Sequence, residues 1–186
     1  STRVRASAAS DVYKRQVQID GNYDESVKEA ARLAEEHGWH VVSDTSYDGY
    51  EAIPRDVMQG YGTIAAEAIE QRNDGPHTFT HVFIQGGVGG LAAGVVSYFA
   101  ERFGEQRPLC VIVEPDQADC LFQSAIKGQA ALATGSVDSI MAGLACGETS
   151  PLAWRFLHVL ADVFMTIPDH AAVDAMRTFA AGAERD

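Results

Sequence analysis

Short apolar runs alternate with amphipathic stretches along residues 17–186 of the chain. A continuous apolar run predicts a buried parallel strand at Leu109–Val113, and β-rich runs predict strands at Thr80–Gln85 and Val163–Ile167. Shorter β-rich runs at Val17–Ile19 and Trp39–Ser43 predict two further strands. Helices are predicted in the intervals, from residue 22 or 24 to 37 and over Val57–Arg72, Leu91–Phe103, Ala118–Lys127, Pro151–Ala161 and Asp169–Ala180. Strands that alternate with helices predict an α/β fold, with a mainly parallel twisted sheet and helices on both faces.

Cap and turn residues mark several ends of these elements. Asn22 or Asp24 can cap the first helix, and Gly38 can end it. Asp44–Pro54 is polar and aromatic and is expected to form a loop, and Asn73–Pro76 is a turn signal.

Composition narrows the class of protein. The 186 residues suffice for one sizeable core, and the net charge of −12 argues against a nucleic-acid partner. No apolar run approaches the roughly 20 residues of a membrane span. Three cysteines without a Cys-x-x-Cys pair disfavour a disulfide framework or zinc site, and a reducing cytoplasm is expected. His37 and His40 have no matching ligand nearby in sequence, so no metal site is expected.

The first 16 residues differ in composition from the rest. They contain four Lys or Arg side chains and one Asp, so the segment carries a charge of +3 and the remainder −15. The Arg- and Ser-rich composition also fits a transit peptide, but we favour translated adaptor or cloning sequence. We therefore expect residues 1–16 to be a non-native leader and exclude them from the fold argument.

A glycine-rich loop is the strongest local signal for a ligand. Gly86-Gly87-Val88-Gly89-Gly90 lies between a predicted strand and a predicted helix. Glycines allow backbone N–H groups to approach a phosphate, and the helix N-terminus favours negative charge. A tight turn without a ligand is the alternative, although two glycines would suffice for it.

The loop also fits a dinucleotide site on spacing alone. Gly87–Ala92 matches Gly-x-Gly-x-x-Ala, and Glu114 ends the next strand, where a ribose-binding acid would lie. Two features weaken this interpretation. The loop follows the third predicted strand, whereas the dinucleotide motif usually opens its unit, and Pro115 directly after Glu114 has no role in such a site.

Strings around the loop favour a different phosphate. Asn22–Asp24 reads NYD, and Ser43–Pro54 reads SDTSYDGYEAIP. Downstream, the chain reads MQGY at Met58–Tyr61, VEPDQADC at Val113–Cys120 and IMAGLACGE at Ile140–Glu148. In this order, the strings resemble the diaminopropionate ammonia-lyases, which are pyridoxal-phosphate (PLP) enzymes of the tryptophan-synthase-β fold type (fold type II). The similarity runs from about Val17 to the C-terminus.

The resemblance implies an activity and a set of site residues. The activity is α,β-elimination of 2,3-diaminopropionate to pyruvate and ammonia, with PLP as electron sink. Asp44 is implied as the acid–base or ammonium-binding residue, with Thr45 and Tyr47 as substrate neighbours. For the cofactor, the resemblance implies phosphate binding by the glycine loop, Glu114 near the ring, and backbone contacts at its edge from Gly143 and Leu144.

The resemblance also implies a division of the chain and a missing group. Residues 17–56 would be a remnant of the small domain, and 57–186 part of the large PLP-binding domain. The Schiff-base lysine is expected upstream, since Lys14, Lys28 and Lys127 all lie in other contexts. We therefore expect an internal fragment, inactive alone, of a protein that is a cytoplasmic homodimer at full length and binds a small amino acid.

Three other functions stay open from the sequence. A serine/threonine dehydratase shares the glycine loop and Val-Glu-Pro, but lacks the string around Asp44. A fragment of a dinucleotide-binding oxidoreductase fits the loop spacing. A non-catalytic module could use the same loop for a phosphorylated ligand.

Overall fold

The computed structural model describes residues 17–72 and 79–182 of the chain. The elements follow one another as α2 (Tyr23–His37), α3 (Ala52–Arg72), β1 (His81–Gln85), α4 (Gly90–Phe103), η2 (Gly104–Gln106), β2 (Leu109–Pro115), α5 (Cys120–Lys127), η3 (Ala142–Leu144), α6 (Pro151–Leu160), β3 (Val163–Ile167) and α7 (Asp169–Ala181). The predicted leader at residues 1–16 and the predicted turn at Asn73–Pro76 lie outside the described residues.

A parallel sheet forms the centre of the described chain. Its three strands lie in the order β1-β2-β3, and Ile84 of β1 pairs with Ile112 of β2, which pairs with Phe164 of β3. All three strands were predicted from the sequence, and the predicted parallel α/β class is confirmed. β2 runs on to Pro115, so Glu114 lies within the strand.

The two other predicted strands were wrong. Val17–Ile19 and Trp39–Ser43 form no strand and lie beside α2, where they contribute to a cavity of about 330 Å³. Trp39 and Val42 stay 53% and 78% exposed. A β-rich run becomes a strand only when a neighbouring strand accepts its backbone hydrogen bonds.

Local sequence signals explain both ends of α2 and the start of α3. Asn22 caps α2 in a capping box with Glu25, and Gly38 ends the helix with φ of 67°. α3 begins at Ala52 instead of the predicted Val57, because a proline such as Pro54 is tolerated in the first helical turn. The predicted loop therefore ends at residue 51.

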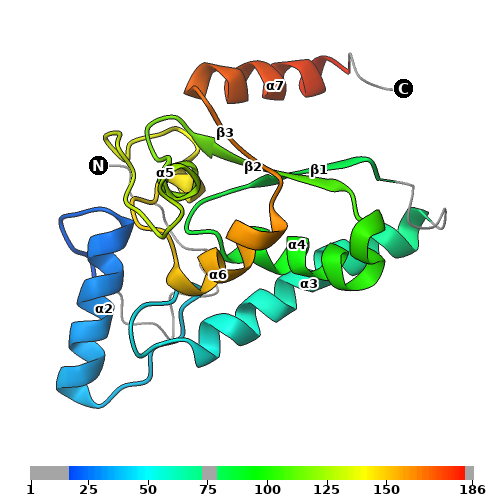
Figure 1. The fold of residues 1–186 in the computed structure, drawn as a ribbon. Coiled ribbons are helices and arrows are strands. Elements are labelled where there is room, and N and C mark those ends of the chain that lie inside the picture. The colour runs from blue at the N-terminus through cyan, green and yellow to red at the C-terminus, as the bar shows by residue number, and fades with distance from the viewer. Residues whose placement is uncertain (1–16, 73–78, 183–186) are drawn as a thin grey trace.

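Three helices cover one face of the sheet. In Figure 1, α3, α4 and α6 lie together below the strands. Small side chains on α4, including the fully buried Ala92 and Ala93, bring this helix close to its neighbours. At Gly94 the approach leaves no room for a side chain, because a Cβ would collide with the carbonyl of Met58 on α3. The core therefore lies between this helical layer and the sheet.

The opposite face of the sheet is much more open. α7 lies on that side, above the strands in Figure 1, and none of its residues is buried. Phe83 is 66% exposed and Leu109 48%, and Val163 and Met165 of β3 are 45% and 36% exposed. The prediction of helices on both sides therefore holds, although α7 buries little of the second face.

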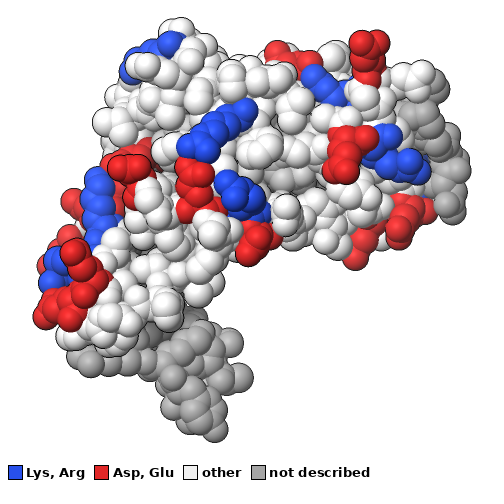
Figure 2. Space-filling model, turned by 60° about the horizontal axis from the view of Figure 1, so that its bottom comes forward, with Lys and Arg blue, Asp and Glu red and all other residues white. Residues whose placement is uncertain are grey.

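Charged side chains on the surface form mixed groups. Figure 2 shows basic side chains next to acidic ones over one face of the molecule. Ion pairs join Arg32 to Glu29 and Glu36 on α2, and Arg155 on α6 to Glu51. Among the described helices, none is both long enough and apolar enough to cross a bilayer.

Candidate functional site

The glycine loop connects β1 to α4 at the carboxyl end of the sheet. Gly86 extends the β1–β2 ladder by donating its N–H to the Val113 carbonyl at 2.8 Å. Gly89 has a φ of 102°, a conformation that favours glycine, and α4 begins at the next residue. The first N–H groups of a helix have no acceptor within the helix. The loop therefore presents backbone donors and the positive end of the α4 dipole together.

A cavity of about 450 Å³ opens over this loop. It contains the predicted residues Asp44, Gly143 and Leu144 in its wall, although they come from separate parts of the chain. The walls approach closely, since a Cβ on Gly87 would lie 3.3 Å from the Gly143 carbonyl oxygen. The volume is within the range of about 300–1,000 Å³ typical of small-molecule sites. We call it the glycine-loop cavity.

Two tyrosines lie near Asp44 in the glycine-loop cavity. The Tyr23 hydroxyl donates to Asp44 Oδ1 at 3.1 Å, and Tyr61 also lines the glycine-loop cavity. Burial, and then the nearby Asp44 carboxylate, raise the pKa of both phenols. Both phenols therefore stay protonated at neutral pH and can donate hydrogen bonds.

These tyrosines were not predicted as site residues. Tyr23 and Tyr61 did lie within two of the quoted strings, NYD and MQGY. Their place in these strings was the only hint in the sequence that they belong to the site. Their proximity could not be predicted, because only the folded chain brings α2 and α3 to the same cavity.

Glu114 lies apart from the cavity wall. Its side chain is buried, and its two carboxylate oxygens accept the backbone N–H groups of Leu121 at 2.8 Å and Phe122 at 2.7 Å. Burial raises the pKa of Glu114 to about 8, although these donors act in the opposite direction. The carboxyl group therefore fastens the start of α5 to β2, and its predicted contact with a cofactor ring stays a prediction.

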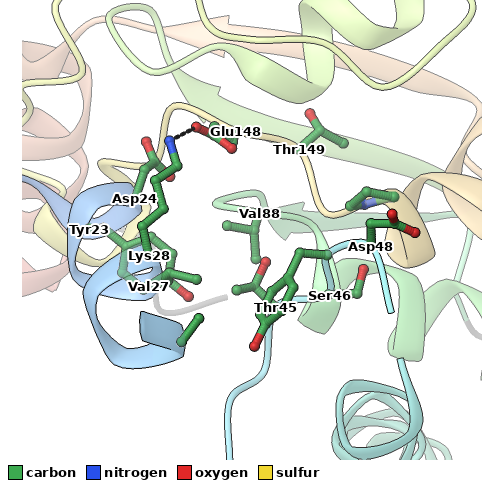
Figure 3. Close-up of a pocket in the computed structure, with 13 residues that line it drawn as sticks. Tyr23, Asp24, Val27, Lys28, Thr45, Ser46, Asp48, Val88, Glu148 and Thr149 are labelled. Atoms are coloured by element: carbon green, nitrogen blue, oxygen red, sulfur yellow. Dashed lines mark hydrogen bonds and ion pairs between the residues drawn. The ribbon is translucent and has the colours of Figure 1, made fainter. Parts of the chain in front are cut away.

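The predicted substrate residues Thr45 and Tyr47 line a second cavity. This cavity, of about 310 Å³, lies between α2 and the loop at residues 43–50 (Figure 3). It shares Tyr23 and Val88 with the glycine-loop cavity. The predicted acid–base residue and the predicted substrate residues therefore face two adjoining cavities.

An ion pair lies at the wall of the second cavity. Lys28 Nζ on α2 is 2.6 Å from Glu148 Oε1, and both side chains are solvent-exposed (Figure 3). The sequence placed Lys28 on a surface helix, and the structure adds this partner. Nearby, Asp24 accepts the Gly147 N–H at 3.0 Å.

The three cysteines and the described histidines lie in separate surroundings. Cys110, Cys120 and Cys146 are free thiols in the structure, and burial is the main cause that raises the pKa of Cys146 to about 12. The His37 and Trp39 rings are in contact, with centroids 4.5 Å apart and planes tilted by 32°. Across residues 17–72 and 79–182, no group of three or more His, Cys, Asp or Glu side chains is arranged to hold a metal ion.

A family model described as "Pyridoxal-phosphate dependent enzyme" matches residues 5–184. The match includes residues 5–16, and the assignment of residues 1–16 as a leader stays a prediction. Diaminopropionate ammonia-lyase of Escherichia coli (strain K12) is 42% identical over 177 residues, which are 95% of this chain and 44% of that protein. The chain therefore spans less than half the length of this curated relative.

Two further comparisons agree with this result. A crystal structure of the E. coli ammonia-lyase in complex with an aminoacrylate-PLP azomethine reaction intermediate superposes with a TM-score of 0.77 and 43% identity, over 87% of this chain and 41% of that one. The biosynthetic L-threonine dehydratase of Corynebacterium glutamicum is 33% identical over 136 residues, which are 73% of this chain and 29% of that protein.

Proposed function

This chain belongs to the pyridoxal-phosphate dependent enzymes, and we propose that it supplies the phosphate-binding part of a diaminopropionate ammonia-lyase. The observation that carries the proposal is the glycine-loop cavity. It brings Gly87, Gly89 and Gly90 of the loop, the start of α4 and Asp44 to one site, while Gly86 is buried beneath the loop. The identity of 42% to the E. coli ammonia-lyase supports the same assignment.

The residues present fit the phosphate of PLP. The loop packs tightly against the other walls of the cavity, since a Cβ on Gly87 or Gly90 would lie 3.3 Å from the carbonyl oxygen of Gly143 or Asp44, and glycines leave the loop N–H groups accessible to a phosphate. We propose that Gly86 to Gly90 bind the phosphate, and that the backbone at Gly143 and Leu144 contacts the edge of the ring. The buried Glu114 would act indirectly, by fixing α5 beside the loop.

The proposed reaction removes ammonia from a small diamino acid. PLP supplies an electron sink for the substrate Cα when bound. In the proposal, Asp44 holds or moves a proton near Cα or Cβ, and the Tyr23 hydroxyl keeps its carboxylate oriented. With one water, 2,3-diaminopropionate would yield pyruvate and two molecules of ammonia. Thr45 and Tyr47 would contact the substrate from the second cavity.

The lysine that this family of reactions uses is proposed to lie outside the chain. None of the described residues that line the glycine-loop cavity is a lysine. Lys28 pairs with Glu148 beside the second cavity, and Lys127 is exposed at the end of α5. We propose that the chain alone is inactive and that the full-length protein is a cytoplasmic homodimer.

A comparison of two ligands tests the phosphate site. PLP is expected to bind the purified chain at least about tenfold more tightly than pyridoxal, which lacks the phosphate, as measured by calorimetry. Gly87→Ala should remove most of this preference, because the new methyl group points toward Gly143. Gly60→Ala is the matched control, since a Cβ there meets nothing within 4 Å.

Two outcomes would count against the proposal. Equal affinity for PLP and pyridoxal would exclude a phosphate site at the loop, and tighter binding of NAD than of PLP would favour the dinucleotide alternative. Pyruvate formed from diaminopropionate by the chain with PLP would refute the proposed dependence on an outside lysine.

A further inference from the structure

Two buried serines connect the loop that carries Asp44 to the glycine loop. Ser46 and Ser150 are 5% and 1% exposed, and their Oγ atoms are 2.8 Å apart. Ser150 caps the N-terminus of α6, and its backbone N–H donates to the Val88 carbonyl at 3.0 Å. A continuous path of hydrogen bonds therefore runs from the Asp44 loop through both serines to the glycine loop.

Further hydrogen bonds fix the geometry of the pair. The Leu152 N–H donates to Ser46 Oγ at 2.9 Å, and the Ser46 N–H donates to Ser150 Oγ at 3.3 Å. The Ala153 N–H also points to Ser150 Oγ, at 3.4 Å. A buried polar network of this kind selects one arrangement, because water cannot replace a lost partner.

Asp44 lies close to this link, and the Tyr23 hydroxyl is the hydrogen-bond partner of its carboxylate. Asp44 lies two residues before Ser46, and its backbone carbonyl oxygen packs against the start of α4 at Gly90. The Tyr50 hydroxyl binds Val41 and Ser43, which closes the loop onto its own flanking segment. The loop is also joined to α6 by the ion pair between Glu51 and Arg155. Because these side chains are partly exposed to solvent, the pair contributes little to holding the loop in place.

We propose that Ser46 and Ser150 are positioning residues that hold the Asp44 carboxylate in register with the phosphate-binding glycine loop. Figure 3 shows Ser46 and Val88 on separate segments around the second cavity. The inference rests on the function proposed above. Neither serine is assigned to the chemical step, since each acts through the loop that it holds.

Amide hydrogen exchange tests the link without any ligand. In Ser46→Ala, exchange should accelerate both at residues 44–48 and at residues 88–93, as measured by mass spectrometry under native conditions. Ser124→Ala is the matched control. Ser124 is also fully buried and hydrogen-bonded, but to Cys120, Thr149 and Ala131. Its loss should leave exchange at residues 88–93 unchanged.

Ligand binding supplies the second readout. Ser46→Ala should weaken binding of PLP by about two- to tenfold, the range expected for one buried hydrogen bond, and leave the affinity for pyridoxal unchanged. Ser46→Thr retains the hydroxyl group, so binding should recover. Because the two serines act as one unit, adding Ser150→Ala should cause little further loss.

The outcomes separate this inference from the proposed function. Unchanged exchange at residues 88–93 in Ser46→Ala, or additive losses of PLP affinity in the double variant, would overturn the positioning role. If the wild-type chain binds PLP no better than pyridoxal, the phosphate site fails. The exchange experiment then still decides whether the serines couple the two loops.

Discussion

The two faces of the sheet are built from the same three strands but have different surroundings. On one face, Ile84 and Ile112 lie almost entirely buried beneath the helices. On the other, Phe83 and Leu109 are largely exposed, although each is the direct chain neighbour of a buried residue. Parallel sheets are usually covered on both faces, so apolar character along a strand does not reveal which face is covered.

The covered face is also the one that carries the candidate site. Gly86 follows β1 directly, and a Cβ there would lie 2.8 Å from Leu121 and 3.0 Å from Ile112. Glu114 of β2 points to this same side, where it binds the start of α5. Stability and the geometry of the glycine loop therefore depend on the same layer of side chains.

Truncation of one side chain on each face gives the largest expected contrast. Ile112→Ala should lower the free energy of unfolding by about 2–5 kcal/mol, because it removes buried contacts and leaves a cavity. Leu109→Ala, on the same strand but facing the open side, should cost much less. Urea titration measures both, and equal losses would contradict the difference between the faces.

A substitution at Gly86 should have the next largest effect. Gly86→Ala is expected to cost about 1–3 kcal/mol, since its methyl group would crowd Leu121, Ile112 and Glu114. Gly143→Ala is the control, because a Cβ there meets nothing within 4 Å. A Gly86→Ala variant as stable as wild type in thermal unfolding would show that the covered face is loosely packed at this point.

Glu114 should make stability depend on pH. Its pKa of about 8 lies above the ordinary value of 4.5, so the fold favours the protonated carboxyl group. The contribution of Glu114 to the free energy of unfolding should be complete below about pH 4.5. It should decline as the pH rises to about 8, by no more than about 1.4 kcal/mol per pH unit. Glu114→Gln should lack this decline in urea titrations, and identical pH profiles would refute the prediction.

The smallest effect on stability is expected on the open face. Phe83→Ser should change the free energy of unfolding by no more than about 0.5 kcal/mol, because the ring is already largely exposed. Self-association, measured by sedimentation velocity, should decrease as the apolar surface shrinks. A large loss of stability would mean that this face is covered in solution.

Local patterns predicted the elements that form the core. The apolar and β-rich runs of β1, β2 and β3 were sufficient, because each run lies next to another strand in the fold. Trp39–Ser43 had an equally β-rich pattern, yet it lies beside α2 and forms no strand. Whether a β-rich run forms a strand depends on whether another strand lies beside it in the fold. The local sequence gives no information about that neighbour.

The candidate site was predictable only in part. The glycine loop stood out, because four glycines between a strand and a helix have few other uses. Asp44, Gly143 and Leu144 came from the family resemblance, and they do lie in the wall of the glycine-loop cavity. The separation of Thr45 and Tyr47 into a second cavity depends on where α2 and the 43–50 loop pack, which no local pattern reports.

The attachment of α2 has a kinetic consequence. This helix buries none of its residues and is joined to the rest of the described chain by polar contacts near its start, at Tyr23, Asp24 and Lys28. A helix held in this way opens as a separate unit, more often than the packed α4. Because one contact is an exposed ion pair, added salt should shorten the time for which α2 stays closed over the second cavity.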